Sequence, residues 1–159
     1  MISIQKVNSR NVWKLLALEV GEAQKHFVAT NTESIVEAYT TLAAGGVAVP
    51  FGIYEEQTPV GFLMIGYGDQ PEAENPSIAH DNYCIWRLMI DKNHQGRGFG
   101  TQALRLALDY IRTFPCGPAG KCYLSYEPEN ETAKKLYHRF GFRETGEMDG
   151  EEIIASLEL

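Results

Sequence analysis

A nearly unbroken apolar run, followed closely by a glycine-rich turn and a helical pattern, constrains the fold of this chain most. The run covers 83–90 and contains a single charge, at Arg87. Such a run is typical of a central strand that is covered on both faces. The turn Gln95–Gly100 carries glycine at three alternate positions, and from Thr101 onward apolar residues recur at helical spacing. The sequence therefore predicts a strand, a tight turn and a helix in close succession.

This turn has the composition of an anion-binding site. The first backbone N–H groups of a helix have no partner within the helix and carry a partial positive charge. Glycine has no side chain to block the approach of an anion. A strand, a glycine-rich turn and a helix start are together typical of a pyrophosphate site, to which Arg97 could add a charged contact. The alternative is a plain tight turn in which the glycines serve the backbone alone.

Two nucleotide-binding patterns fit the turn less well. The Walker A pattern is absent, because no Gly-Lys-Ser or Gly-Lys-Thr follows four variable residues. The segment 98–103 fits the dinucleotide pattern G-x-G-x-x-A. Residues 91–95, however, separate this turn from the strand, and Glu127 is a late candidate for the acidic residue that such sites place after the next strand. A dinucleotide-binding module is therefore a minor alternative.

The rest of the chain predicts one domain over 1–159, a length within the usual range of about 100–200 residues. The chain shows no linker, internal repeat or low-complexity segment. In its first half, the periodicity predicts a strand around 2–7, helices over 9–19 and 32–43, a hairpin of 47–55 and 59–67, and a loop over 69–81. After the central strand, turn and helix, it predicts a strand over 121–126, a helix opened by Pro128 and Asn130 and ending at Gly141, and a last hairpin over 142–159.

Charge and cysteine content narrow the partners. The formal net charge is −7, which disfavours nucleic acid as a partner and favours basic ligands such as amines, or simply keeps the protein soluble. No stretch approaches the roughly 20 apolar residues of a membrane span, and 1–6 lacks the build of a signal peptide. Cys84, Cys116 and Cys122 lack the spacing of a disulfide framework or a metal site. We therefore expect a cytoplasmic protein with reduced thiols, no metal, no membrane contact and no nucleic acid.

Two segments resemble the signatures of a known family, the Gcn5-related N-acetyltransferases (GNAT). The turn Gln95–Gly100 matches the signature Q/R-x-x-G-x-G/A, and an apolar strand precedes it at the family's spacing. Downstream, Asn130–Phe142 resembles the second signature, N-x-x-A-x-x-L-Y-x-x-x-G-F. The two occur in the family's order and separation. The resemblance is dense over 83–147, whereas 1–67 agrees only in the order of its elements.

The resemblance implies an α/β (α+β) fold with a mixed, mostly antiparallel sheet and about four flanking helices. A V-shaped opening between the strands 83–90 and 121–126 would hold the co-substrate, acetyl-CoA. Backbone N–H groups would bind its pyrophosphate, the central strand would pair with its pantetheine arm, and Asn130 would touch it from the far side. The implied residues are Gln95, Gly96, Arg97, Gly98, Phe99, Gly100 and Thr101 for the pyrophosphate and Leu88, Met89 and Ile90 for the pantetheine.

The resemblance also implies a mechanism, in which a neutral amine attacks the thioester. An N–H group near Leu88–Met89 would stabilise the oxyanion, and Tyr137 would protonate the leaving thiolate. The helical pattern alone would make Tyr137 a core residue. The amine must first lose a proton to a base or a water chain, and some relatives that acetylate polyamines carry acidic residues at the positions of Trp86 and Arg87, a pattern from which this chain departs. Glu127 is the candidate base, and His80 and Asp81 are the alternatives. Each of the three could instead be an ordinary solvated group on the surface.

The acceptor is the least constrained part. The segment 24–39 and the hairpin that follows resemble the acceptor-side elements of bacterial spermine/spermidine (diamine) acetyltransferases. Glu33 and Glu37 lie one helical turn apart and could hold the second ammonium of a diamine, or could form an ordinary charged helix face. We therefore expect a small-molecule N-acetyltransferase, with polyamine as the leading acceptor. The alternatives are a protein or peptide N-acetyltransferase and a non-catalytic acyl-CoA sensor. Family members are often homodimers, and the last hairpin could pair across subunits.

Overall fold

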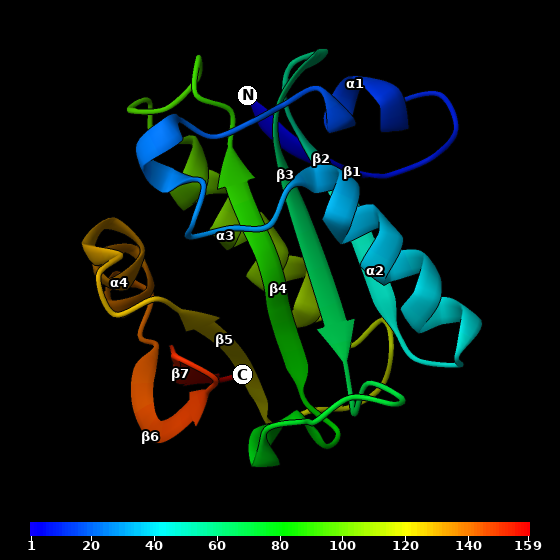
Figure 1. Cartoon of the computed structure of the whole chain (residues 1–159), viewed down its shortest axis with the longest axis vertical. Coiled ribbons are helices and arrows are strands. Elements are labelled where there is room, and N and C mark those ends of the chain that lie inside the picture. Colours follow the sequence, from blue (N-terminus) through cyan, green and yellow to red (C-terminus); the bar gives the residue numbers. More distant parts are fainter.

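Seven strands form one sheet in the order β1-β2-β3-β4-β5-β7-β6 in the computed structural model, which describes residues 1–159 (Figure 1). Only β4 and β5 pair in parallel, which confirms the mixed, mostly antiparallel sheet. The strands are β1 (Ile2–Lys6), β2 (Ala48–Glu55), β3 (Thr58–Tyr67), β4 (Tyr83–Ile90), β5 (Lys121–Tyr126), β6 (Arg143–Asp149) and β7 (Glu152–Glu158). The helices are α1 (Val12–Leu16), α2 (Asn31–Ala43), α3 (Phe99–Ile111) and α4 (Glu131–Arg139), with short 3₁₀ turns at Glu22–Gln24 and Ser77–Ala79.

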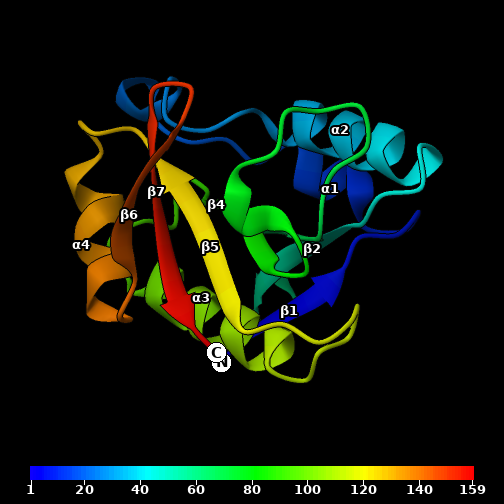
Figure 2. The same ribbon diagram turned by 90° about the horizontal axis from the view of Figure 1, so that it is seen from below.

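The two faces of the sheet carry different helices. Alternate residues of a strand point to opposite faces. On β3, Leu63 and Ile65 join the larger apolar cluster, which includes α3, whereas Phe62 and Met64 join a smaller cluster with Ala38 of α2. Figure 2 shows α2 above the sheet and α3 below it. β3 and β4 are thus covered on both faces, which the sequence predicts for β4.

The central strands β4 and β5 pair only at their first residues and then separate. Tyr83 faces Cys122 and Cys84 faces Tyr123, and no further pairs follow. On its other side β4 remains paired with β3 up to Ile90, with a bulge that leaves Trp86 as an extra residue. Bulges bend a strand and recur next to active sites. The predicted V-shaped opening is therefore present, and it widens toward the C-terminal ends of both strands (Figure 1).

Several predicted elements differ from the structure in their boundaries or content. The first helix is short, Val12–Leu16, because the side chain of Asn31 donates to the carbonyl oxygens of Leu15 (2.8 Å) and Leu18 (3.4 Å) and so caps its end. The helix after the glycine-rich turn begins at Phe99 rather than at Thr101. The predicted loop 69–81 contains the 3₁₀ turn Ser77–Ala79.

Candidate active site

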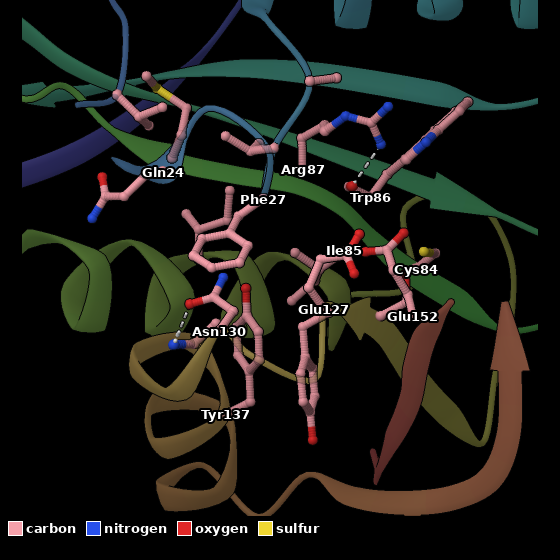
Figure 3. Close-up of a pocket in the computed structure, with 18 of the residues that line it drawn as sticks. Gln24, Phe27, Cys84, Ile85, Trp86, Arg87, Glu127, Asn130, Tyr137 and Glu152 are labelled. Atoms are coloured by element: carbon pink, nitrogen blue, oxygen red, sulfur yellow. Dashed lines mark hydrogen bonds between the residues drawn. The ribbon is translucent and has the colours of Figure 1, made fainter. Parts of the chain in front are cut away.

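A large cleft lies where β4 and β5 separate. Its volume is about 1110 Å³, and its walls are β4, the end of β5, α4, the glycine-rich turn and the segment from Gln24 to α2. Figure 3 shows side chains from β4, from α4 and the residue before it, from the end of β5 and from the segment before α2 around one space. The topology thus brings both sequence signatures to the same cavity.

The glycine-rich turn presents a row of unused backbone donors. None of the seven N–H groups from Gln95 to Thr101 donates to an acceptor within the protein, and the first helical bond runs from Gln102 N to Gly98 O. Gly96 (φ +76°) and Gly98 (φ +78°) adopt the left-handed conformation that curls the turn, and a Cβ at either position would meet open space. This arrangement fits a pyrophosphate, because free N–H groups at a helix start bind anions.

The side chains of this turn have different roles. The Gln95 amide nitrogen donates to the carbonyl of Ile90 (2.9 Å) and to Gln24 Oε1 (2.8 Å), so it fixes the turn against β4 and the opposite wall. Arg97 does not face the cleft as expected. It pairs with Glu55 of β2 (2.7 Å), and its guanidinium lies over the Phe99 ring, because folding brings β2 beside the turn. Only the backbone of Arg97 is thus placed for an anion.

The predicted pantetheine-binding segment forms one edge of the cleft. Leu88, Met89 and Ile90 all line the cavity, and beyond Cys84 the cleft edge of β4 has no strand partner. The opposite edge is held against β3 at very close range, since a Cβ at Gly61 would clash with the carbonyl oxygen of Met89. An extended chain could therefore add to the open edge of β4 as a strand would.

Asn130 and Tyr137 reach the cleft from α4. The side-chain oxygen Oδ1 of Asn130 caps the helix by accepting from Ala133 N (3.2 Å), and its side-chain nitrogen Nδ2 is left to donate into the cavity. Tyr137 packs its ring against Tyr126 and Phe142, while its hydroxyl points into the cleft (Figure 3). Burial, with the negative charge of Glu152, raises the pKa of Tyr137 to about 12. The hydroxyl therefore stays protonated at neutral pH and can act as a proton donor.

Arg87 and Glu37 form an ion pair across the acceptor side of the cleft. Arg87 Nη2 donates to Glu37 Oε2 at 2.9 Å, and Nη1 donates to the carbonyl of Trp86. The Nε atom of Arg87 is buried without a partner. Glu33 also lines the cleft and has no ion-pair partner. The two predicted ammonium ligands are therefore unequal, because Glu37 is already neutralised.

Three further carboxylates gather on the other side of this space. They are Glu127, directly after β5, and Asp149 and Glu152, which face each other across the turn between β6 and β7. Burial raises the pKa of the Glu152 carboxyl, and the charges of Glu127 and Asp149 raise it further. Sequence reasoning missed Glu152 and Asp149. The Asp149-Gly150 turn located the hairpin, but nothing in its pattern indicated that the turn would reach the cleft.

The alternative base candidates lie elsewhere. His80 and Asp81 are on the loop before β4, where His80 pairs with Asp69 (2.9 Å) and Asp81 (3.4 Å), and neither lines the cleft. They stand at the closed end of the opening, where β4 and β5 still pair. The structure therefore excludes both as direct contacts of a substrate in this cavity.

The sequence model of the acetyltransferase (GNAT) family matches residues 12–142. The chain belongs to this family. It is therefore an acyltransferase of the acetyl-CoA-dependent N-acetyltransferase type, and the resemblance inferred from the two signatures is confirmed. The minor alternative of a dinucleotide-binding module is thereby set aside.

Curated members of the acetyltransferase family match over nearly the whole chain. One, described as "Probable spermine N(1)-acetyltransferase" of Bacillus subtilis subsp. natto (strain BEST195), is 30% identical over 158 residues, which is 96% of each protein. The spermine/spermidine N(1)-acetyltransferase of Bacillus subtilis (strain 168) is 29% identical over 158 residues, again 96% of each.

Solved acetyltransferase structures share the fold. An aminoglycoside acetyltransferase in complex with coenzyme A superposes with a TM-score of 0.75 at 16% identity, covering 99% of this chain and 95% of that one. An N-acetyltransferase of Thermoplasma acidophilum in complex with coenzyme A gives a TM-score of 0.66 at 15% identity, with 100% and 99% covered. Both of these structures contain coenzyme A, and their similarity to this chain is one of fold.

All three cysteines are free thiols; Cys122 is buried, and burial raises its pKa well above the ordinary value. No three or more His, Cys, Asp or Glu side chains are grouped so that they could hold a metal ion. No helix combines the length and apolar character needed to cross a membrane.

Proposed function

We propose that this acetyltransferase transfers an acetyl group from acetyl-CoA to a primary amine of a small molecule, and that the amine is a polyamine or diamine. The observation that carries the proposal is the charge of the acceptor side of the cleft. Eight carboxylates line the whole cleft against two side chains of fixed positive charge, Lys25 and Arg87. Five of the eight lie on the acceptor side around Arg87, and these are Glu33, Glu37, Glu127, Asp149 and Glu152. Such an excess of negative charge in a concave site attracts and holds a cationic ligand.

The co-substrate fits the opposite half of the cleft. We place its pyrophosphate on the free N–H groups of Gln95–Thr101 and its pantetheine arm along Leu88–Ile90. The amide nitrogen of Asn130 would contact it from α4. In this placement the thioester lies near Leu88–Met89, between Tyr137 and the carboxylates. The two substrates then meet where β4 bends.

The chemistry follows from this placement. The amine nitrogen attacks the thioester carbon, and a backbone N–H near Leu88–Met89 stabilises the negative oxygen. When the C–S bond breaks, the Tyr137 hydroxyl donates its proton to the sulfur. A carboxylate of the cleft must first remove a proton from the ammonium form of the amine, and Glu127 is the candidate that the sequence supplies.

The identity of the acceptor is supported by two further points. The Bacillus relatives that match over nearly the whole chain carry the names of spermine and spermidine acetyltransferases. Glu33 faces the cleft on α2 and is placed to take a distal ammonium, whereas Glu37 would have to exchange its bond to Arg87 for one to the substrate. A polyamine carries the several cations that this distribution of charge requires.

Turnover of acetyl-CoA with a panel of acceptors tests the proposal. The panel holds putrescine, spermidine, spermine, an aminoglycoside, amino acids and a lysine peptide. Product is read by mass, because the three free cysteines would react with a thiol dye. We expect turnover confined to the polyamines. Turnover of the peptide alone would identify a protein acetyltransferase, and silence with acetyl-CoA still stabilising the fold would identify a sensor.

The assembly and location of the protein are proposed as well. β6 ends the sheet, and most of its residues are exposed, so its free edge could pair with β6 of a second copy. We therefore propose a homodimer in the cytoplasm, without membrane or nucleic-acid contact. Light scattering of the purified chain would give twice its mass of 17.8 kDa, and a monomer would contradict the pairing.

A further inference from the structure

The turn between β6 and β7 holds two like charges together at the cleft. Asp149 and Glu152 are register partners on either side of Gly150-Glu151, and both line the cavity. Like charges directly opposite each other destabilise a strand pair. Figure 2 shows the turn on the same side of the sheet as α2, which is the acceptor side. The chain thus places an unfavourable pair where the substrate must bind.

Glu152 is the more enclosed of these two carboxylates. Asp149 is exposed, whereas Glu152 is half-buried at the start of β7. Figure 3 shows the carboxylates of Glu127 and Glu152 turned toward each other and toward β4, below Arg87. A carboxylate held in this way among other negative charges has a strong tendency to take up a proton.

Glu152 also shares its space with Tyr137. The charge of Glu152 acts on the Tyr137 hydroxyl, and after burial it contributes most to the raised pKa of that group. The same charge acts on the Cys84 thiol of β4. Glu152 therefore lies within electrostatic reach of Tyr137 on α4, the proposed proton donor, and of β4, which carries the predicted thioester site.

We propose that Glu152 is the base that removes the proton from the acceptor ammonium, directly or through one water molecule. This inference rests on the proposed function, since it needs an amine acceptor. The ammonium gives one proton to the Glu152 carboxylate, and the free amine attacks the thioester carbon. As the C–S bond breaks, Tyr137 protonates the sulfur, and the proton that the nitrogen loses on forming the amide restores Tyr137. Glu152 releases its proton to solvent, so the sum is one amide, one thiol and one proton.

The surroundings of Glu152 suit this cycle. Burial is the first cause of its raised pKa, followed by Glu127 of the β5 end and Asp149 of β6, while Arg87 of β4 lowers it. A base works best when its pKa approaches the working pH. Tyr137 is thus held protonated as a donor, and the raised pKa of Glu152 makes its carboxylate a stronger proton acceptor than an ordinary one in the same cavity.

The test compares Glu152→Gln with wild type over a range from about pH 6 to about pH 10, using the amine that wild type acetylates fastest. We expect kcat/KM at neutral pH to fall roughly a hundredfold or more. The deficit should shrink toward pH 10, because a growing share of the amine is then already deprotonated. Glu152→Asp should recover part of the rate. Glu151→Gln is the matched control, since Glu151 is exposed and does not line the cleft, and it should behave as wild type.

Several outcomes would overturn the proposal. A loss of the same size at every pH would assign Glu152 a structural role, and thermal stabilisation by acetyl-CoA would show whether the fold and the co-substrate site survive. A pH-dependent loss in Glu127→Gln but not in Glu152→Gln would move the base to Glu127. If the fastest amine is not a polyamine, the proposed acceptor is wrong. The pH dependence of Glu152→Gln is then measured with the amine that reacts, and it still tests the role of Glu152 as the base. If no amine reacts, both proposals fail.

Discussion

Arg87 Nη2 lies 2.9 Å from Glu37 Oε2, and this ion pair joins the central strand β4 to the helix α2 across the acceptor side of the cleft. The Arg87 side chain is 18% exposed and that of Glu37 is 41% exposed. Arg87 is therefore largely shielded from solvent, whereas Glu37 is more accessible to it. Arg87 also faces Glu152, whose pKa it lowers against the larger effect of burial. The guanidinium thus lies amid the carboxylates of the acceptor side.

Breaking this pair from either end should change acceptor affinity in opposite directions. Glu37→Gln leaves Arg87 unpaired in the cleft, so it should raise KM for a polyamine. Arg87→Gln frees Glu37 to bind an ammonium and should lower that KM. An interaction of about 0.5–1 kcal/mol, typical of a partly exposed pair, corresponds to roughly a two- to fivefold change. Steady-state kinetics would measure it, with KM for acetyl-CoA as the internal control. A shift of the same sign in both variants would contradict the electrostatic account.

Removing the Tyr137 hydroxyl should separate its chemical role from its packing role. Tyr137→Phe keeps the ring against Tyr126 and Phe142, so the thermal midpoint and acetyl-CoA binding should change little. Loss of a general acid should lower kcat by roughly a hundredfold or more. Because the pKa of Tyr137 is about 12, wild type should show no fall in rate from its ionisation at any pH below about 11. A variant with normal kcat would reduce Tyr137 to a core residue.

A side chain at Gly98 should weaken the pyrophosphate site. Gly98 has φ +78° at the residue before α3, a conformation that costs an alanine about 1–2 kcal/mol. Relaxation of this strain would move the free N–H groups of the turn. We expect Gly98→Ala to raise KM for acetyl-CoA several-fold and to leave KM for the amine unchanged. Gly120→Ala is the matched control, because Gly120 lacks a positive φ and its Cβ would meet open space. An equal effect of both changes would refute a local role.

The part of the cleft that we propose binds acetyl-CoA could be located from the sequence because its residues are neighbours in sequence. The run of β4, the glycines and the start of α3 are contiguous, and the second signature supplies Asn130 and Tyr137 together on α4. In each of these segments the local sequence pattern determines whether the chain forms a strand, a turn or a helix. That local structure then determines where the backbone N–H groups and the side chains of Asn130 and Tyr137 lie. The side chain of Arg97 is the exception. Its direction depends on Glu55, which only the folded sheet brings near.

The acceptor half was less predictable because it is assembled from distant segments. Glu37 of α2 meets Arg87 of β4, and Glu152 meets Glu127 only when the last hairpin packs beside β5. In the sequence each of these residues looks like an ordinary surface charge. The bulge at Trp86, which turns Arg87 toward α2, depends on a register shift in the pairing of β3 with β4. No pattern within a single segment of the sequence predicts either the bulge or the cavity that these residues share.

Asp91 should link stability to pH through the junction of β4 and the glycine-rich turn. It is buried at 5% exposure, and its carboxylate accepts from the backbone N–H groups of Glu19 (3.0 Å) and Asn93 (3.2 Å) and lies 3.3 Å from His94 Nδ1. Although burial alone would raise its pKa, these hydrogen bonds hold the pKa below the ordinary value of 3.8. The carboxylate therefore contributes stability above that value, and the contribution is lost as pH falls through the lower pKa of the folded state.

The substitution Asp91→Asn isolates this contribution. Its amide can accept only through one oxygen, so one or more N–H groups lose their partner. We expect the free energy of unfolding at neutral pH to fall by about 1–3 kcal/mol. The difference from wild type should narrow as the pH drops below the ordinary value of 3.8, because the wild-type carboxylate then becomes protonated as well. Urea titrations of both proteins at several pH values would measure the gap. A difference that stayed constant through the acid range would mean that Asp91 stabilises the junction by shape and not by charge.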